Sequence, residues 1–145
     1  MVDPGSVIGM ESRQLGRTGR SVGVVGLGCW QLGGDWGSVG DEVALEVLAA
    51  AVDAGVTFLD TADVYGDGRS EKLIGRFLAG GRTGLTVATK MGRRADPHTA
   101  DAYTLDAFRG WTDRSRSNLG VDTLDLVQLH CPPSEVFRRE STYDA

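Results

Sequence analysis

The chain has 145 residues, of which 41% are hydrophobic and 24% charged, and its formal net charge is −5. These values are typical of a globular domain and argue against long disordered segments and coiled coils. Acidic and basic residues are mixed along the chain without a basic stripe, so we expect no nucleic-acid partner.

The sequence also argues against a membrane or secreted location. No apolar run approaches the ~18 residues of a membrane span, and residues 1–6 have neither the basic start nor the apolar stretch of a signal peptide. Cys29 and Cys131 lie far apart without a CxxC pair, which is typical of free thiols in a reducing compartment. We expect a cytoplasmic protein with no membrane partner.

The N-terminal part reads as a flexible segment over residues 1–12, because the structured pattern begins only at Arg13. Met10 is therefore an alternative to Met1 as the start of translation. A short hairpin that turns at Thr18 is expected next, followed by a strand over Val22–Trp30.

Helices and strands then alternate at a regular pitch. Each of three helices has apolar residues at helical spacing, a polar residue suited to the N-cap and a closing glycine. The expected N-caps are Asp41, Ser70 and Thr104, and the closing glycines are Gly55, Gly80 and Gly120. Strands are expected over residues 56–60, 85–89 and 124–129.

Four strands joined by three helices predict an α/β fold with a parallel sheet and right-handed crossovers. An open doubly wound sheet and a (β/α)8 TIM barrel both fit, and reactive side chains at several strand ends favour the barrel. Such a barrel needs about 250 residues. We therefore expect residues 13–145 to form the N-terminal half of a barrel, truncated after its fourth strand, with a fourth helix beginning at Glu140.

The candidate catalytic residues lie at the ends of these strands. Asp60, Lys90 and His130 each end an apolar strand, and Tyr65 follows Asp60 by five positions. Reduction of a carbonyl by hydride needs a proton donor for the developing oxyanion. A tyrosine can serve when a nearby ammonium group stabilises its phenolate, a carboxylate can hold that ammonium, and a histidine can orient the carbonyl oxygen.

Each of these residues alone also has a purely structural explanation. Asp60 could be a turn residue, Tyr65 a rim aromatic, Lys90 a solvated side chain and His130 a buried histidine. Trp30, just after the first strand, could line the substrate mouth or belong to the core. We call Asp60, Tyr65, Lys90 and His130 the candidate tetrad. A catalytic role is favoured over the structural explanations, because all four of those independent explanations would have to hold together.

Five segments together resemble the aldo-keto reductase family in residue type, order and spacing. They are Gly26–Gly33, Asp60–Gly66, Ser70–Gly75, Thr89–Lys90 and Leu119–His130. The resemblance implies NADPH as the cofactor and a small aldehyde or ketone as the substrate. It also implies Tyr65 as general acid, Asp60 and Lys90 as its tuning pair and as cofactor contacts, and His130 as the substrate-orienting group. Trp30 is expected as a further substrate contact because of its place after the first strand.

Most cofactor contacts of the resembling family lie in the second half of the barrel, so we expect little activity from these residues alone. A half barrel leaves unpaired strand edges, which predicts either self-association or a marginally folded, aggregation-prone chain. The alternatives are a non-catalytic nucleotide-sensing or regulatory subunit and an inactive gene remnant.

Other candidate residues have weaker interpretations. A dinucleotide-binding GxGxxG motif would need glycine where Gln31 stands, and no metal site is expected. Asp63 and Asp67 are interpreted as turn residues. Arg93 and Arg94, after the strand of Lys90, are interpreted as solvated or as contacts of the second half of the barrel.

Overall fold

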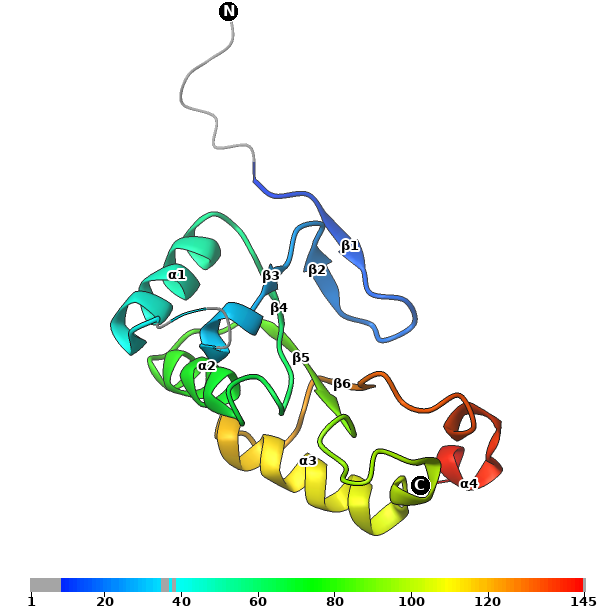
Figure 1. The fold of residues 1–145 in the computed structure, drawn as a ribbon. Helices are drawn as coiled ribbons and strands as arrows, with labels where there is room; N and C mark the ends of the chain where they lie inside the picture. The colour runs from blue at the N-terminus through cyan, green and yellow to red at the C-terminus, as the bar shows by residue number, and fades with distance from the viewer. Residues whose placement is uncertain (1–8, 35–36, 38, 145) are drawn as a thin grey trace, which may run out of the picture.

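The computed structural model describes residues 9–34, 37 and 39–144. It begins with an antiparallel hairpin and continues with a four-stranded parallel sheet, whose strands are neighbours in chain order (Figure 1). The hairpin strands are β1 (Ser12–Gln14) and β2 (Ser21–Gly23). The sheet strands are β3 (Leu27–Gly28), β4 (Phe58–Asp60), β5 (Thr86–Met91) and β6 (Leu126–Leu129).

Helices connect the parallel strands and lie along one side of the sheet (Figure 1). The α-helices are α1 (Asp41–Asp53), α2 (Arg69–Ala79), α3 (Leu105–Leu119) and the single turn α4 (Glu140–Tyr143). Short 3-10 turns are η1 (Trp30–Gly33), η2 (Ala100–Ala102) and η3 (Val136–Arg138). This arrangement confirms the predicted α/β fold with a parallel sheet, and α4 begins at Glu140 as expected. None of the helices in the described ranges is long and apolar enough to cross a membrane.

The main core lies between the sheet and helices α1 and α2. Leu48 of α1, Leu59 of β4, and Leu73 and Ile74 of α2 are at most 2% exposed. A second, smaller core joins Phe108 of α3 with other buried residues, namely Ala100, Tyr103 and Val136. The apolar spacing that predicts α2 is therefore the face that the helix buries.

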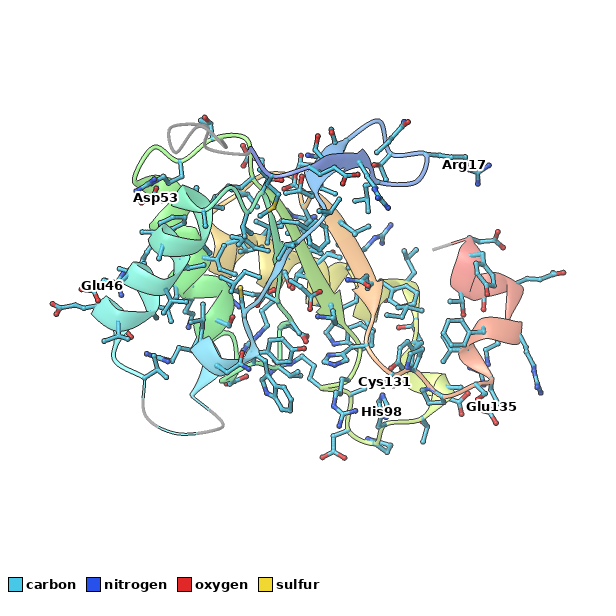
Figure 2. The ribbon with its side chains drawn as sticks, turned by 90° about the horizontal axis from the view of Figure 1, so that it is seen from above. Arg17, Glu46, Asp53, His98, Cys131 and Glu135 are labelled. Atoms are coloured by element: carbon cyan, nitrogen blue, oxygen red, sulfur yellow. The ribbon has the colours of Figure 1, made fainter. Side chains whose placement is uncertain are left out.

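The hairpin covers the amino-terminal end of the sheet. The Gly23 amide donates to Thr57 Oγ1, just before β4, and Arg20 pairs with Asp125, just before β6, at 2.8 Å. Figure 2 shows Arg17 on the hairpin and Cys131 after β6 toward opposite ends of the molecule. The carboxyl ends of the strands consequently remain open for a site.

The strand expected over Val22–Trp30 is wrong in extent. The Val24 amide donates to the Glu11 carbonyl in continuation of the hairpin, whereas the Cys29 amide donates to the Asp60 carbonyl in the parallel sheet. The segment therefore serves two different sheets and divides into β2 and β3, while Trp30 begins η1.

Two predicted helix caps are also wrong. The N-cap of α1 is Gly40, because the carboxylate of Asp41 pairs with arginines of α2. The N-cap of α2 is Gly68, because the hydroxyl of Ser70 is buried against the Cys29 carbonyl. Thr104 is confirmed as the N-cap of α3, since its Oγ1 accepts from the Ala107 amide.

The N-terminal segment starts its pairing slightly earlier than expected. Residues 1–8 lie outside the described residues, β1 begins at Ser12, and the apolar side chain of Met10 packs against the main core. Lys90 lies inside β5, which continues to Met91, so the strand predicted to end before it is longer than expected.

Candidate active site

The candidate tetrad gathers at the carboxyl end of the sheet. The ammonium group of Lys90 donates to Asp60 Oδ2 at 2.7 Å and to the Thr61 carbonyl at 2.8 Å. It also lies 3.4 Å from the Tyr65 hydroxyl oxygen. The side chain of Lys90 is only 16% exposed, so water screens these contacts weakly. The ammonium therefore bridges the carboxylate and the phenol.

Tyr65 lies between two other rings at the rim. Its ring stacks on Trp30 with centroids 6.0 Å apart and meets His130 edge-on at 5.8 Å. These three residues share a cavity of about 430 Å³ with Val64, Arg93 and Cys131. A cavity of this size is suitable for a small molecule.

The environment of His130 favours its neutral form. Burial lowers the pKa of the imidazole, and the positive charges of Lys90 and Arg93 lower it further. Its Nδ1 is buried and has no hydrogen-bond partner among the described residues. A neutral imidazole in edge contact with the Tyr65 ring can form a hydrogen bond with a carbonyl oxygen in the cavity.

The four strands of the parallel sheet, the candidate tetrad and the cavity beside Tyr65 all lie within the residue range that matches a known family. The model of the aldo/keto reductase family matches residues 24–144. The chain belongs to the aldo/keto reductase family. The residues that resemble this family in the sequence are therefore part of a match over most of the chain.

Individual members of the family are similar in sequence and in structure. The 6-dehydroglucose reductase of Novosphingobium aromaticivorans is 37% identical over 140 residues, which are 87% of this chain and 45% of that protein. An aldo-keto reductase structure from Pseudomonas aeruginosa superposes with a TM-score of 0.76 at 30% identity, covering 92% of this chain and 53% of the other.

A third relative was solved in complex with NADPH. The aldo-keto reductase of Klebsiella pneumoniae in complex with NADPH has a TM-score of 0.70 at 25% identity, over 87% of this chain and 40% of that one. The chain spans about two fifths of the length of several curated relatives that it matches. The solved relatives are (β/α)8 barrels, and this chain corresponds to part of such a barrel.

The loop that carries Tyr65 is held by close backbone packing. A Cβ atom on Gly33 would lie 2.7 Å from the Gly66 nitrogen, and Gly66 itself has a φ of 58°. Side chains at either position would separate η1 from the loop. The Asp63 amide donates to the Lys90 carbonyl at 3.1 Å, which ties the loop to the strand of the lysine.

Polar side chains, buried except for the half-buried Asn118, form a connected layer around Glu71 of α2. Glu71 Oε1 accepts from Thr89 Oγ1 at 2.6 Å, and Glu71 Oε2 accepts from Asn118 Nδ2 at 2.8 Å. Ser70 Oγ donates to the Cys29 carbonyl and lies 2.9 Å from Thr61 Oγ1. We call these residues the polar layer: Thr61, Ser70, Glu71, Thr89 and Asn118.

The polar layer connects α2 to the neighbouring elements and bonds the residue that precedes Lys90. Sequence reasoning gave Glu71 no role, although it lies in a segment that resembles the family. The signal that could have found it is an acidic residue among the apolar positions of a helix that packs on a sheet.

Asp63 and Asp67 do more than form a turn, which corrects the sequence-based interpretation. Asp67 has a φ of 51° and accepts from Arg94 at 2.8 Å and from Arg114 at 2.7 Å. Asp63 is fully buried, and its carboxylate oxygens have no hydrogen-bond partner in the described part of the chain. Burial raises the pKa of Asp63 to about 6, which nearby Arg94 partly opposes.

The two cysteines lie in different environments. Burial raises the pKa of the Cys29 thiol to about 12, so it stays protonated. Cys131 is exposed at the cavity that contains Tyr65. Within the described ranges, no three His, Cys, Asp or Glu side chains gather into a group that could hold a metal ion.

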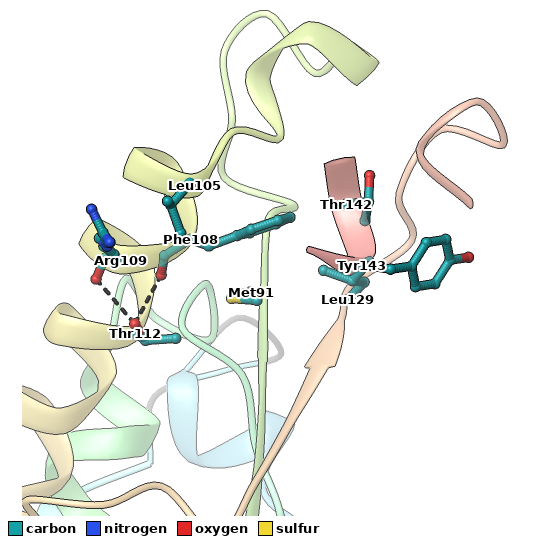
Figure 3. Close-up of a pocket in the computed structure, with 8 residues that line it drawn as sticks. All are labelled: Met91, Leu105, Phe108, Arg109, Thr112, Leu129, Thr142 and Tyr143. Carbon is teal, nitrogen blue, oxygen red and sulfur yellow. Dashed lines mark hydrogen bonds between the residues drawn. The ribbon is translucent and has the colours of Figure 1, made fainter. Parts of the chain in front are cut away.

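A second cavity, of about 410 Å³, lies between α3, the ends of β5 and β6, and α4. Figure 3 shows Phe108, Leu129 and Tyr143 around it, and Thr112, whose hydroxyl donates to carbonyls of its own helix. The full lining is Met91, Leu105, Phe108, Arg109, Thr112, Leu129, Thr142 and Tyr143. Most of these lining residues are apolar or aromatic, so we call it the apolar cavity. None of the candidate tetrad lines it, and we assign it no chemistry.

Proposed function

We propose that the protein to which this chain belongs is an NADPH-dependent oxidoreductase that reduces a small aldehyde or ketone to an alcohol. The observation that carries the proposal is the position of the Lys90 ammonium, 2.7 Å from the Asp60 carboxylate and 3.4 Å from the Tyr65 hydroxyl. A proton donor beside a fixed cation is what a developing alkoxide requires.

In this mechanism Tyr65 is the general acid. NADPH supplies a hydride to the carbonyl carbon when it is bound. The Tyr65 hydroxyl donates its proton to the carbonyl oxygen, which becomes the alcohol, and the Lys90 ammonium stabilises the phenolate that remains. Asp60 holds Lys90 in place, and neutral His130, in edge contact with the Tyr65 ring, orients the carbonyl oxygen.

The rim offers polar groups that fit the nicotinamide end of the cofactor. Asp60 gives one carboxylate oxygen to Lys90, and its side chain is still 39% exposed, so it can accept a further hydrogen bond from a carboxamide. Asp60 and Lys90 would hold this end, and Trp30 and His130 would contact the substrate. The names of relatives with NADP(+) or NADPH support this choice of cofactor.

The substitution Tyr65→Phe tests the proposal. It removes one hydroxyl and should lower kcat/KM for aldehyde reduction by about 10²–10⁴-fold, which is the usual contribution of a general acid. Tyr143→Phe, at a tyrosine that is 69% exposed, is the matched control and should leave turnover unchanged. Turnover is followed by NADPH oxidation, and NADPH affinity by fluorescence titration.

Full turnover by the Tyr65→Phe variant would overturn the assignment of the acid. If the unsubstituted protein bound NADPH but reduced no aldehyde of a broad panel, a nucleotide-sensing or regulatory role would replace the proposed activity.

A further inference from the structure

The cavity beside Tyr65 contains one cation that no described residue neutralises. Arg93 lines this cavity, is exposed, and makes no hydrogen bond or ion pair with any described residue. Its neighbour Arg94 differs, because it binds the Asp67 carboxylate and the Asp63 carbonyl. The two adjacent arginines therefore have different roles. Arg94 binds the loop that carries Tyr65, whereas the guanidinium group of Arg93 is available to a ligand in the cavity.

The backbone fixes Arg93 at the cavity mouth. Gly92 has a φ of 99°, and a Cβ atom there would lie 2.6 Å from the Tyr103 ring. The Ala95 amide donates to the Gly92 carbonyl at 3.1 Å and closes a turn around Arg93. A turn that is packed on one side and hydrogen-bonded on the other positions its side chain with little freedom of the main chain.

The charges around the cavity do not balance. Lys90 is neutralised by Asp60 at 2.7 Å, and His130 is held neutral, as described above. None of the described residues that line the cavity is acidic. The positive charge of Arg93 thus remains without a counter-charge among the described lining residues. The planar fork of its guanidinium group matches the two oxygens of a carboxylate.

We propose that Arg93 determines specificity by binding a carboxylate on the substrate while the carbonyl of the same molecule lies at Tyr65 and His130. The substrate class is then a small aldehyde or ketone that carries a carboxylate group. This inference rests on the proposed function for the carbonyl, but the charge preference of the cavity is measurable by binding alone. The stacked rings of Trp30 and Tyr65 form a wall that suits a flat molecule between the two groups.

The experiment compares two probes of the same shape, 4-carboxybenzaldehyde and the neutral 4-carbamoylbenzaldehyde. Binding is measured by calorimetry with the chain, and turnover with NADPH is measured in parallel. The unsubstituted protein should prefer the carboxylate probe by about fivefold to tenfold in Kd, as expected for a charge-assisted pair that is partly screened by water.

Three variants isolate the role of Arg93. Arg93→Met should abolish the preference without weakening the neutral probe, and Arg93→Lys should restore part of it. Arg17→Met, on the hairpin at the opposite end of the molecule, is the matched control and should change nothing (Figure 2). In turnover the change should appear in KM for the carboxylate probe and not in kcat.

The ring of His130 gives a readout independent of any ligand. Because the charge of Arg93 lowers the pKa of His130, Arg93→Met should raise that pKa in an NMR titration, whereas Arg17→Met should not.

The possible results separate the two proposals. A protein that binds neither probe, binds both equally, or keeps its preference in Arg93→Met overturns the inference about Arg93. A preference that depends on Arg93 without reduction of either aldehyde supports the inference about Arg93 and overturns the proposed activity.

Discussion

The polar layer around Glu71 and the apolar cavity beside α4 are built from opposite kinds of side chain. In the polar layer, Glu71 is fully buried and both of its carboxylate oxygens accept hydrogen bonds. Around the apolar cavity, Leu105 is 41% exposed and Tyr143 is 69% exposed.

The difference shows which part of this fold fixes the positions of its side chains most precisely. Hydrogen bonds are directional and fix the distance between two atoms, whereas apolar contacts favour burial without fixing a geometry. The polar layer bonds Thr89, the residue before Lys90, so the placement of the ammonium depends on directional contacts. The apolar cavity is lined by none of the tetrad, although two of its lining residues, Met91 and Leu129, adjoin Lys90 and His130 in the chain.

The largest expected effect follows from breaking the polar layer. Glu71→Ala leaves the buried hydroxyl of Thr89 and the half-buried amide of Asn118 unpaired, which should lower the free energy of unfolding by about 2–4 kcal/mol. Glu46→Ala, at an exposed position of α1, is the matched control and should cost less than about 0.5 kcal/mol. Urea denaturation measures both. Equal losses in the two variants would show that the layer does not stabilise the fold.

A second, smaller effect should depend on pH. Since burial raises the pKa of Asp63 from 3.8 to about 6, the folded chain binds its proton more tightly than the unfolded chain does. This group therefore makes stability fall as pH rises from about 4 to about 6, and the cost persists above that range.

Asp63→Asn removes this ionisation and should raise the free energy of unfolding at pH 7 by about 2–3 kcal/mol at most, with no such gain near pH 4. The midpoint of urea denaturation as a function of pH measures the difference. Asp53→Asn, at a side chain that is 72% exposed, is the matched control. A gain that is the same at pH 4 and pH 7 would contradict the role of the buried charge.

The smallest effect is expected at the apolar cavity, where we propose that copies of the chain associate. β6 pairs only with β5 among the described strands, and Phe137, whose carbonyl accepts from the hydroxyl of the cavity residue Tyr143, is 54% exposed. Phe137→Ser removes exposed apolar surface and should weaken self-association by about tenfold, or ~1.4 kcal/mol. Sedimentation equilibrium measures the constant, and Val43→Ser on α1, which is 53% exposed, is the control. Monomeric behaviour of the unsubstituted chain would refute the proposal.

The sequence alone predicted those features that depend on neighbouring residues. Thr104 and Gly120 mark the ends of α3, where the structure has an N-cap bond and a left-handed C-cap, because both signals act within one helical turn. The strand ends at Asp60, Lys90 and His130 could be placed at one rim because parallel strands share their direction.

Features that depend on distant partners escaped prediction. Asp41 and Ser70 have good capping side chains, but Asp41 pairs with Arg69, 28 positions away, and Ser70 bonds to Cys29, 41 positions away. Tertiary contacts override local preferences at both sites. Likewise, the different tasks of Arg93 and Arg94 cannot be read from two identical neighbours, because only the folded chain brings Asp67 to one of them.

The spacing of the tetrad along the chain has a consequence for biosynthesis. Asp60 and Lys90 are 30 positions apart, and Tyr65 lies between them. At about 5–20 residues per second, a ribosome adds this interval in roughly 2–6 s. The carboxylate, the phenol and the ammonium therefore leave the ribosome as one short βαβ unit, and they can pair before His130 has emerged. A nascent chain stalled shortly after β5 has emerged would already hold three of the four groups.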